Sequence, residues 1–385
     1  MSGGLSTLSS MGSISPYDSA QGRRYRVRYR KPDQTQTDKR GFRTKREAEL
    51  FLASVELDKA RGGYIDPGRA RVTVEQWMAI WLSSRTDVRA TTRDRIEGII
   101  AKHVNPKLGH LPLSDVTRLG VQQWASTLPG EPATVRKIVL VLSGALQLAV
   151  EDGRLSHNPA ATLRLARTVQ KRKRYLSHAE VGALAQAVGR QPNGAELGYD
   201  ILVLVLAYCG LRWGEASGLR VKDVDLERSR LNVEATVVMV KGHQREEAPK
   251  DYEHRSIPIP AFLRPHLARQ IAGRSPHSPV FYGQRTGTWL RNAVFRLGWF
   301  NDAAASIGLT GLTPHELRHT AASLAISAGA NVKAVQRMLG HAKASVTLDV
   351  YADLFEEDLD AVAVSLNAAA LQTTVGDFYA VAETE

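Results

Sequence analysis

Cysteine is nearly absent from this chain of 385 residues, which has a single one, Cys209. A disulfide framework and a cysteine-based zinc site are therefore both excluded. Long apolar runs are missing too, because the longest, from Ile201 to Cys209, is too short to span a bilayer. The sequence also has no Walker-type loop and no carboxylate cluster that would hold Mg²⁺. We therefore expect chemistry without a metal or a cofactor.

Acidic residues are fewer than basic ones: the chain has 39 aspartates and glutamates and 51 lysines and arginines, which gives a formal net charge of +12. This balance predicts attraction to a polyanion, either nucleic acid or an anionic membrane surface. The lack of a spanning segment makes the membrane the weaker alternative. The first 20 residues have neither a charged segment nor an apolar one, so we expect a disordered start rather than a signal peptide, and a cytoplasmic protein.

Arginine alternates with tyrosine and valine from residue 24 to residue 30. This period of two predicts a strand with an arginine face and an apolar face. A second short strand is expected at 39–43, and Thr44 can cap a helix over 45–61. We interpret the module as a small sheet that binds DNA and is backed by one helix, the alternative being a solvated strand face. The expected DNA-binding side chains are Arg24, Arg26, Arg28, Arg30, Lys39, Arg40, Arg43 and Lys45.

Residues 73 to about 165 follow a helical pattern throughout. Thr73 opens the first helix with a capping box, and further helices are expected to start at Thr91, Thr117 and Thr134. Three tryptophans, at 77, 81 and 124, can either stack on bases or pack in a core, and their helical spacing favours the core.

A basic joint follows the helices and is expected to lie along DNA phosphates, the alternative being a plain solvated linker. Its charged residues are Arg164, Arg167, Lys171, Arg172, Lys173 and Arg174. A capping box at Ser177 then opens a new helix. From there helices dominate to about residue 370, interrupted by strands predicted over 229–239 and 253–259, with Gly242 in a loop between them.

Three ordered boxes concentrate arginine, histidine and tyrosine in this last region, at 208–226, 312–325 and 338–355. In the second box His315 and Arg318 are three residues apart, so they share a helical face. Pro314 suits the first turn of that helix, whose N-terminus already attracts phosphate. In the third box Gly340 ends a helix and places His341 on a turn, ten residues before Tyr351. In the first box Glu215 can orient Arg212 from one turn further along.

These boxes resemble the tyrosine recombinase (phage integrase) family. The family pattern has Gly-Leu-Arg, a lysine on a hairpin, His-x-x-Arg-His, Leu-Gly-His and a tyrosine about ten residues later. Arg212, His315, Arg318, His341 and Tyr351 occupy those places. The hairpin lysine corresponds best to Lys250, although Asp251 stands where the family often has threonine or serine, and Lys241 is the weaker alternative.

The resemblance implies a multidomain, mainly α-helical fold with small β-sheets. We expect an arm-type DNA-binding module with a three-stranded sheet and one helix, then a helical core-binding (SAM-like) domain, then an α+β catalytic domain. The expected boundaries are 1–20 for the disordered start, 21–65 for the arm module, 70–165 for the core-binding domain, 166–176 for the linker, 177–370 for the catalytic domain and 371–385 for a C-terminal tail.

The expected chemistry is attack by Tyr351 on a DNA phosphate, which gives a 3′-phosphotyrosine and a free 5′-hydroxyl. Arg212 and Arg318 would stabilise the charge that develops on the phosphate oxygens. Lys250 is expected to protonate the leaving oxygen. His315 would move a proton to or from the tyrosine, and His341 would bind the phosphate. His319 is expected to be structural and to bond the backbone. The alternative for Tyr351 is an ordinary half-buried helix aromatic, a description that also fits Tyr282 and Tyr379.

The resemblance favours a phage or prophage integrase that acts as a tetramer on core-type and arm-type attachment sites through a Holliday junction. A directionality factor and a host DNA-bending protein are possible partners. Three alternatives stay open: a chromosome-dimer resolvase of the Xer kind, a type IB topoisomerase, and a DNA-binding regulator with an inactive site. The arginine-faced sheet disfavours the resolvase, and the filled catalytic positions disfavour the regulator.

Overall fold

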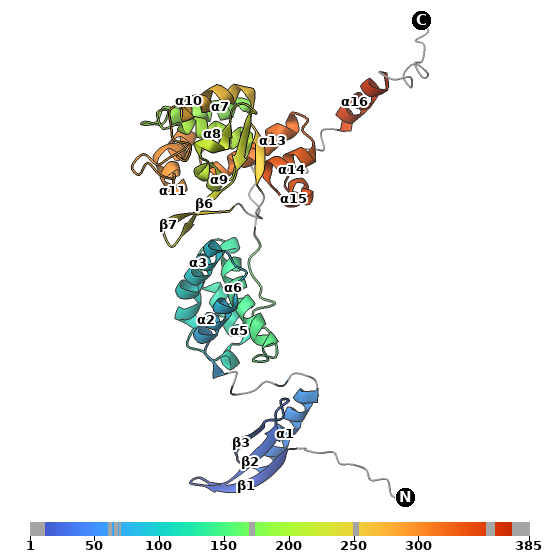
Figure 1. Ribbon diagram of the computed structural model, residues 1–385. Coiled ribbons are helices and arrows are strands. Elements are labelled where there is room, and N and C mark those ends of the chain that lie inside the picture. Colours follow the sequence, from blue (N-terminus) through green and yellow to red (C-terminus); the bar gives the residue numbers. More distant parts are fainter. Residues whose placement is uncertain are drawn as a thin grey trace, which may run out of the picture. The chain divides into compact units, whose positions relative to one another are not determined.

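The computed structural model describes residues 12–60, 64, 68, 71–168, 174–248, 254–351 and 359–371. The chain divides after Gln170 into two compact units. Figure 1 shows a sheet with one helix and a helical bundle in the first unit, and a larger mixed α and β body in the second.

A three-stranded antiparallel sheet opens the first unit, with the order β1-β2-β3. Its elements are β1 (Ser13–Ser19), β2 (Gly22–Arg30), β3 (Gln36–Phe42) and the helix α1 (Lys45–Ala60). Val27 and Tyr29 of β2 are buried together with Ala48 and Val55 of α1. Since successive side chains of a strand point to opposite faces, the four arginines at positions 24, 26, 28 and 30 lie on the face away from this core. The alternation at residues 24–30 therefore predicted the two faces correctly.

The expected disordered start is wrong for residues 13–19, which form β1. This edge strand is mostly polar, so its sequence has no apolar alternation. It forms because its backbone pairs with β2 over seven residues, including Ser15 opposite Arg26. Gly22 adopts a positive φ of 96° directly after the connecting turn, a conformation that glycine adopts without strain.

The helical bundle of the first unit begins at a capping box in which Thr73 and Gln76 bond each other's backbone, as the sequence predicted. Thr117 caps its helix as expected, whereas the last long helix starts at Pro132 rather than at Thr134. Proline is favoured in a first helical turn, where its missing N–H costs nothing. The helices are α2 (Val74–Ser84), α3 (Ala90–Ile99), the π-helical η2 (Ile100–Val104), α4 (Asn105–Leu108), the 3₁₀ turn η3 (Leu113–Asp115), α5 (Arg118–Ser126) and α6 (Pro132–Glu151).

The three tryptophans of this bundle belong to its core, so their predicted packing role is confirmed. Trp77 donates its indole N–H to the carbonyl of Ala145 at 2.7 Å, and Trp124 donates to the carbonyl of His103 at 3.0 Å. Helix α6 is long and apolar enough to cross a membrane by composition. Its residues Leu142 and Leu146 are fully buried in the bundle, which accounts for that apolar character within the protein itself.

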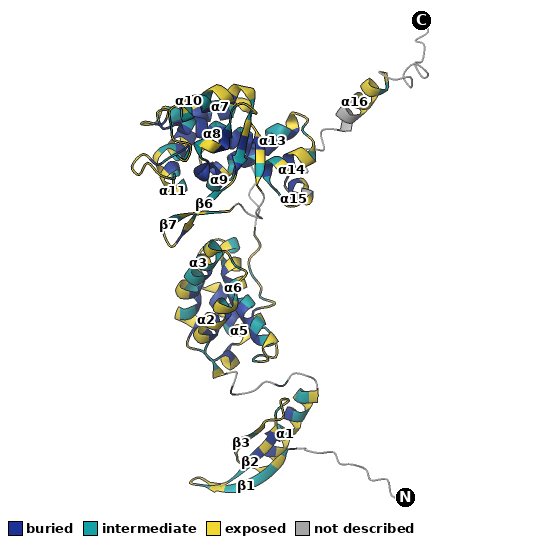
Figure 2. Ribbon diagram, viewed as in Figure 1, coloured by how far each residue is buried: buried dark blue, intermediate teal, exposed yellow. Residues whose placement is uncertain are grey.

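The second unit begins with a capping box between Ser177 and Glu180, again as predicted. Its central helix, α8, is buried along nearly its whole length (Figure 2). The helices are α7 (His178–Gly189), α8 (Tyr199–Cys209), α9 (Trp213–Gly218), α10 (Arg264–Ile271), α11 (Asn292–Phe295), η7 (Arg296–Phe300), α12 (Asn301–Ser306), α13 (Pro314–Ser327), α14 (Val332–Leu339), α15 (Ala344–Tyr351) and α16 (Leu359–Leu371), with 3₁₀ turns η4 (Val221–Asp223) and η6 (Ala261–Leu263).

The strands of this unit differ from the prediction. The segment expected as one strand over 229–239 forms two, β5 (Arg230–Val233) and β6 (Thr236–Val240), which belong to different sheets. One sheet has the order β4-β5-β8, with β4 (Val224–Asp225) and β8 (Arg255–Pro258). The other is a hairpin of β6 with β7 (His243–Glu247), a strand that the sequence did not predict. Lys241 and Gly242 form its two-residue turn with φ of 49° and 79°, which matches a tight hairpin turn.

Candidate active site

Arg212 lies at the N-terminus of α9, directly after the buried helix α8 and the left-handed Gly210. Its Nη1 donates to Glu215 Oε1 at 2.8 Å, and its Nη2 donates to the carbonyl of Gly340 at 2.7 Å. The expected orienting contact from Glu215 is therefore present. The side chain remains 30 % exposed.

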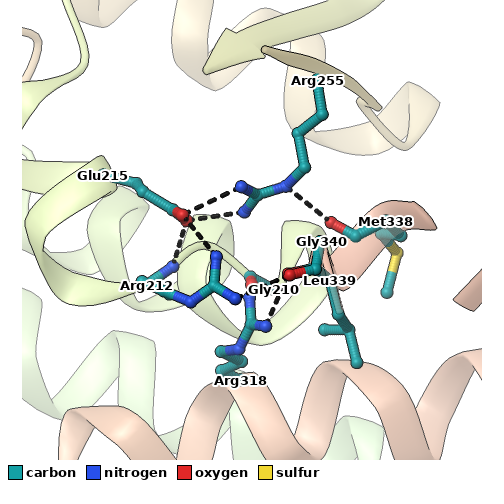
Figure 3. Close-up of polar contacts among 8 residues, drawn as sticks. All are labelled: Gly210, Arg212, Glu215, Arg255, Arg318, Met338, Leu339 and Gly340. Carbon is teal, nitrogen blue, oxygen red and sulfur yellow. Dashed lines mark hydrogen bonds and ion pairs between the residues drawn. The ribbon is translucent and has the colours of Figure 1, made fainter. Parts of the chain in front are cut away.

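Arg318 lies on α13 and is buried. It donates to the carbonyl of Gly210 at 2.6 Å and to the carbonyl of Leu339 at 2.5 Å. Burial and then the positive charge of Arg212 lower its pKa to about 9, so the guanidinium is still charged at pH 7. The two arginines thus bind neighbouring carbonyls of one turn, Leu339 and Gly340, and this turn holds them together (Figure 3).

A third arginine, Arg255, completes this cluster and was not predicted from the sequence. It is the first residue of β8, and it binds both carboxylate oxygens of Glu215 at 2.9 and 2.6 Å. Burial of Glu215 favours its neutral form, but the bonds and charge of Arg255 and the charge of Arg212 outweigh burial and lower its pKa. Figure 3 shows this carboxylate between the two guanidiniums.

His341 follows Gly340, which ends α14 in the left-handed conformation, as the sequence predicted. Its Nδ1 lies 2.9 Å from the hydroxyl of Thr347, and its carbonyl accepts a bond from the side chain of Gln336 at 2.8 Å. Burial, followed by the charges of Arg318 and Arg212, lowers the pKa of His341 to about 4. The imidazole is therefore neutral near pH 7.

Tyr351 ends α15 and packs among residues of α13 and α14. Its hydroxyl lies 2.8 Å from Nδ1 of His319. His319 was predicted to bond the backbone, and the packing of α15 against α13 adds this contact with the tyrosine. The ring of His315 lies 5.0 Å from that of His319, centroid to centroid, in an edge-on arrangement.

Protonation at these groups is shifted by burial. Burial raises the pKa of the Tyr351 phenol to about 12, and the charge of Arg318 opposes this only in part. The pKa of His315 is lowered by burial and by the charges of Arg318 and Arg212. At neutral pH the phenol keeps its proton while His315 is unprotonated, so a proton acceptor stands near the group that must lose one.

Lys250, the predicted general acid, lies outside the described residues. In the sequence it precedes Arg255, the first residue of β8, by five positions. The weaker alternative, Lys241, lies in the β6–β7 turn. Tyr282 is half-buried, and its carbonyl accepts a hydrogen bond from Tyr199, while Tyr379 lies outside the described residues.

The predicted DNA-binding arginines of the first unit are placed mainly on exposed surface. On β2, Arg28 and Arg30 are exposed, while Arg24 and Arg26 are partly covered. On β3, Arg40 lies opposite Arg26 and binds Asp38 at 2.9 Å, and Lys39 and Arg43 also lie at the surface. Lys45 is exposed at the start of α1. Of the basic joint, Arg164, Arg167 and Arg174 are exposed, and Lys171, Arg172 and Lys173 fall outside the described residues.

Removal of Glu215 is expected to destabilise the second unit. The Glu215→Ala protein would leave Arg212 and Arg255 without their shared carboxylate, which costs about 3–5 kcal/mol when one partner of a buried ion pair is removed. The midpoint of urea denaturation measures this loss. Glu227→Ala, an exposed glutamate in the turn before β5, is the matched control and is expected to unfold like the unchanged protein. Equal midpoints for the two variants would contradict a stabilising role.

The arrangement as a whole is an anion site beside a tyrosine. Charged guanidiniums, a neutral imidazole and a helix N-terminus are the groups that bind a phosphate and stabilise added negative charge on it. Within the described residues no group of three or more histidine, cysteine, aspartate or glutamate side chains is arranged to hold a metal ion. The polar groups that converge here are those that can bind a phosphate next to a tyrosine hydroxyl.

Comparison with known proteins finds a phage integrase match in each of the two units. Residues 174–358 match the model of the phage integrase family, and residues 73–128 match that of the SAM-like N-terminal domain of phage integrases. A protein of Mycobacterium tuberculosis that is assigned as the integrase of prophage phiRv2 is 28% identical over 323 residues, which cover 80% of this chain and 82% of that protein.

Two solved structures share the fold. The Tn1549 transposon integrase in complex with a circular intermediate DNA has a TM-score of 0.64 at 22% identity, covering 76% of this chain and 99% of that one. The lambda integrase tetramer bound to a Holliday junction has a TM-score of 0.53 at 20% identity, covering 86% and 94%. The family matches, the order of the boxes and the shared architecture agree, and this chain belongs to the phage integrase family of tyrosine site-specific recombinases.

Proposed function

We propose that this recombinase is a phage or prophage integrase that inserts and excises DNA at attachment sites. The observation that carries the proposal is the joint position of Arg212 and Arg318 on the Leu339–Gly340 turn, next to His341 and in the same unit as the hydroxyl of Tyr351. Such a set suits a single phosphodiester that is attacked by a phenol and needs neither a metal nor ATP, because the bond energy is kept in the phosphotyrosine.

In the proposed reaction the phenol oxygen of Tyr351 attacks phosphorus and the bond from phosphorus to the 5′-oxygen breaks. The products are a 3′-phosphotyrosine and a 5′-hydroxyl, and the 5′-hydroxyl of a second strand then reverses the step to make the recombinant junction. Arg212 and Arg318 stabilise the charge on the non-bridging oxygens. Lys250 supplies the proton that the leaving oxygen takes up, and His341, neutral at pH 7, donates a hydrogen bond to the phosphate.

The tyrosine proton needs an acceptor, since burial raises the pKa of the phenol. We assign this step to the histidine pair of α13. Nδ1 of His319 lies 2.8 Å from the phenol oxygen and is the proposed acceptor, and His315, whose ring centroid lies 5.0 Å from that of His319, is its proposed exchange partner. Burial and the charges of Arg318 and Arg212 lower the pKa of His315, which keeps this imidazole available as a proton acceptor near neutral pH.

A duplex that carries two copies of the bound core site tests the function. The site is first selected from random-sequence DNA by binding to the purified protein. Recombinant product is the expected result and separates the proposal from a type IB topoisomerase, for which relaxation of supercoiled DNA is the sole activity. A regulator with an inactive site would give binding without either product, and that outcome would overturn the proposal.

The proposed arm module carries a further prediction. Deletion of residues 1–65 is expected to abolish binding to arm-type sites and to leave cleavage at the core site intact, since the sheet and α1 form a core of their own. Arm-site affinity that survives the deletion would reject this role, and it would bring the Xer-type alternative forward. Gel-shift titrations with arm-site and core-site duplexes measure the two affinities.

The arginine face can be tested without truncation. An Arg28→Ala/Arg30→Ala protein removes two exposed charges from the face of β2, and it is expected to reduce the slope of log affinity against log salt by about 0.9 for each lost phosphate contact. Arg46→Ala, an exposed change on the helix that backs the sheet, is the control for a lost charge.

The proposed assembly is a homotetramer on DNA that exchanges strands in two steps through a Holliday junction. We place it on DNA in the cytoplasm of a bacterial host, with an excision factor and a DNA-bending protein as accessory partners. The solved lambda integrase tetramer on a Holliday junction supports this arrangement by its shared fold.

A further inference from the structure

We propose that Arg255 is a positioning residue for strand cleavage: it holds Glu215, and through Glu215 it sets the place of Arg212 against the scissile phosphate. The proposal rests on the function proposed above. Arg255 is the first residue of β8 and comes five positions after Lys250. It belongs to none of the three boxes that the sequence pattern identified. Its three side-chain nitrogens all point into the cluster of Figure 3.

The bonds of Arg255 are directed entirely at the protein. Nη1 and Nη2 bind the two oxygens of Glu215, and Nε donates to the carbonyl of Met338 at 3.1 Å. This bidentate contact fixes the orientation of the carboxylate plane as well as its distance from the guanidinium. The side chain is only 10 % exposed, compared with 30 % for Arg212. Arg255 is therefore built to hold protein groups, whereas Arg212 keeps donors for a ligand.

Arg255 also supports the turn that both phosphate-binding arginines contact. A Cβ placed on Gly340 would lie 3.1 Å from the guanidinium carbon of Arg255, so this guanidinium packs directly against the backbone of the turn. The Gly340 carbonyl accepts from Arg212, and the neighbouring Leu339 carbonyl accepts from Arg318. One side chain thereby connects β8, the start of α9 and the end of α14, three segments that are far apart in the sequence.

The charge state of Glu215 depends on this contact. The charged groups that face Glu215 are Arg212 from the start of α9, Arg255 from β8 and Arg318 from α13. Burial favours the protonated carboxyl, and the hydrogen bonds of Arg255 are the largest effect that opposes it. Without Arg255 we expect the pKa of Glu215 to rise, and a protonated Glu215 no longer holds Arg212 as an ion pair.

The test compares four variants with the unchanged protein on a nicked suicide duplex that carries the selected core site. Arg255→Met roughly keeps the length of the side chain but removes its charge and its planar guanidinium. Arg255→Lys keeps the charge but cannot bind both carboxylate oxygens with one planar group. Arg255→Met/Glu215→Gln also removes the titrating carboxyl. Arg230→Met is the matched control, because Arg230 is an exposed arginine in the strand next to β8. Single-turnover cleavage is followed from pH 6 to pH 9 with protein in excess, alongside gel-shift affinity and thermal melting by circular dichroism.

We expect Arg255→Met to slow cleavage on the order of 10²-fold at pH 7, because a small displacement of a catalytic group has an effect of this size. Affinity for the duplex should stay within about threefold, because the hydrogen bonds of Arg255 go to protein groups. The rate of the variant should recover as the pH rises, because deprotonation restores the Glu215 carboxylate. Arg255→Lys should recover part of the rate, the double variant should lose the recovery with pH, and Arg230→Met should match the unchanged protein.

Three results would overturn the proposal. The first is cleavage by Arg255→Met at the rate of the unchanged protein. The second is a parallel loss of affinity, cleavage and melting temperature in both Arg255 variants, which would make the residue a structural support only. The third is a rate loss that is the same at every pH. Failure of the proposed function would look different, since the unchanged protein itself would then give no recombinant product from the two-site duplex.

Discussion

A protein with Tyr351→Phe is expected to bind core-site DNA with unchanged affinity and to form no covalent adduct on a nicked suicide duplex. Phenylalanine fills the same buried space but has no oxygen to attack phosphorus. The loss of the 2.8 Å contact with His319 removes one hydrogen bond, which contributes about 1 kcal/mol to stability. Folding and DNA binding should therefore survive. Denaturing gel electrophoresis of the labelled duplex shows the adduct directly.

The matched control for this change is Tyr282→Phe, a half-buried tyrosine of the same unit whose hydroxyl is removed in the same way. It should retain the adduct in full. A covalent band that persists in the Tyr351→Phe protein would mean that another hydroxyl is the nucleophile, and mapping of the attached peptide would then identify it.

Arg212→Ala is expected to reduce the rate of cleavage about 10²–10³-fold, the effect that is typical when one donor to a developing oxyanion is lost. The cause is electrostatic: the guanidinium lies at the turn where Arg318 also binds, and each would contact a different oxygen of the same phosphate. Glu215 keeps its contact with Arg255 in this variant, so its carboxylate is not left unpaired. Single-turnover kinetics with saturating protein isolate the chemical step from DNA binding.

Two further variants separate charge from geometry in this experiment. Arg212→Lys keeps a positive charge but cannot bind two oxygens with one planar group, so it should recover only part of the lost rate. Arg228→Ala removes the same charge from a side chain that is 86 % exposed, and it should cleave normally. Normal cleavage by Arg212→Ala would contradict the assignment of Arg212 to the phosphate.

Several parts of the site followed from the sequence because they depend on neighbours within a few residues. The spacing of His315 and Arg318 placed both on α13, and Gly340 ended α14 just before His341. Glu215 orients Arg212 from three residues away, as expected. Capping boxes at Thr73 and Ser177 located two helix starts in the same way.

Other features were missed because they depend on pairing across the chain. The strand β1 has a polar sequence and exists through its backbone bonds to β2. The segment 229–239 looked like one strand, but its halves pair with different partners, β5 with β8 and β6 with β7. A period of two in the side chains is the same for any partner strand, so it could not distinguish these pairings.

By itself the sequence determined the family, the order of its boxes and the residue types that can bind and attack a phosphate, since each box is a short motif whose spacing is set by a helix or a turn. Only the tertiary structure decided that Arg255 holds Glu215 and that His319 contacts the phenol of Tyr351. The reason is that these contacts join residues from separate strands and helices, and their partners become neighbours only when β8, α9, α13 and α15 pack together.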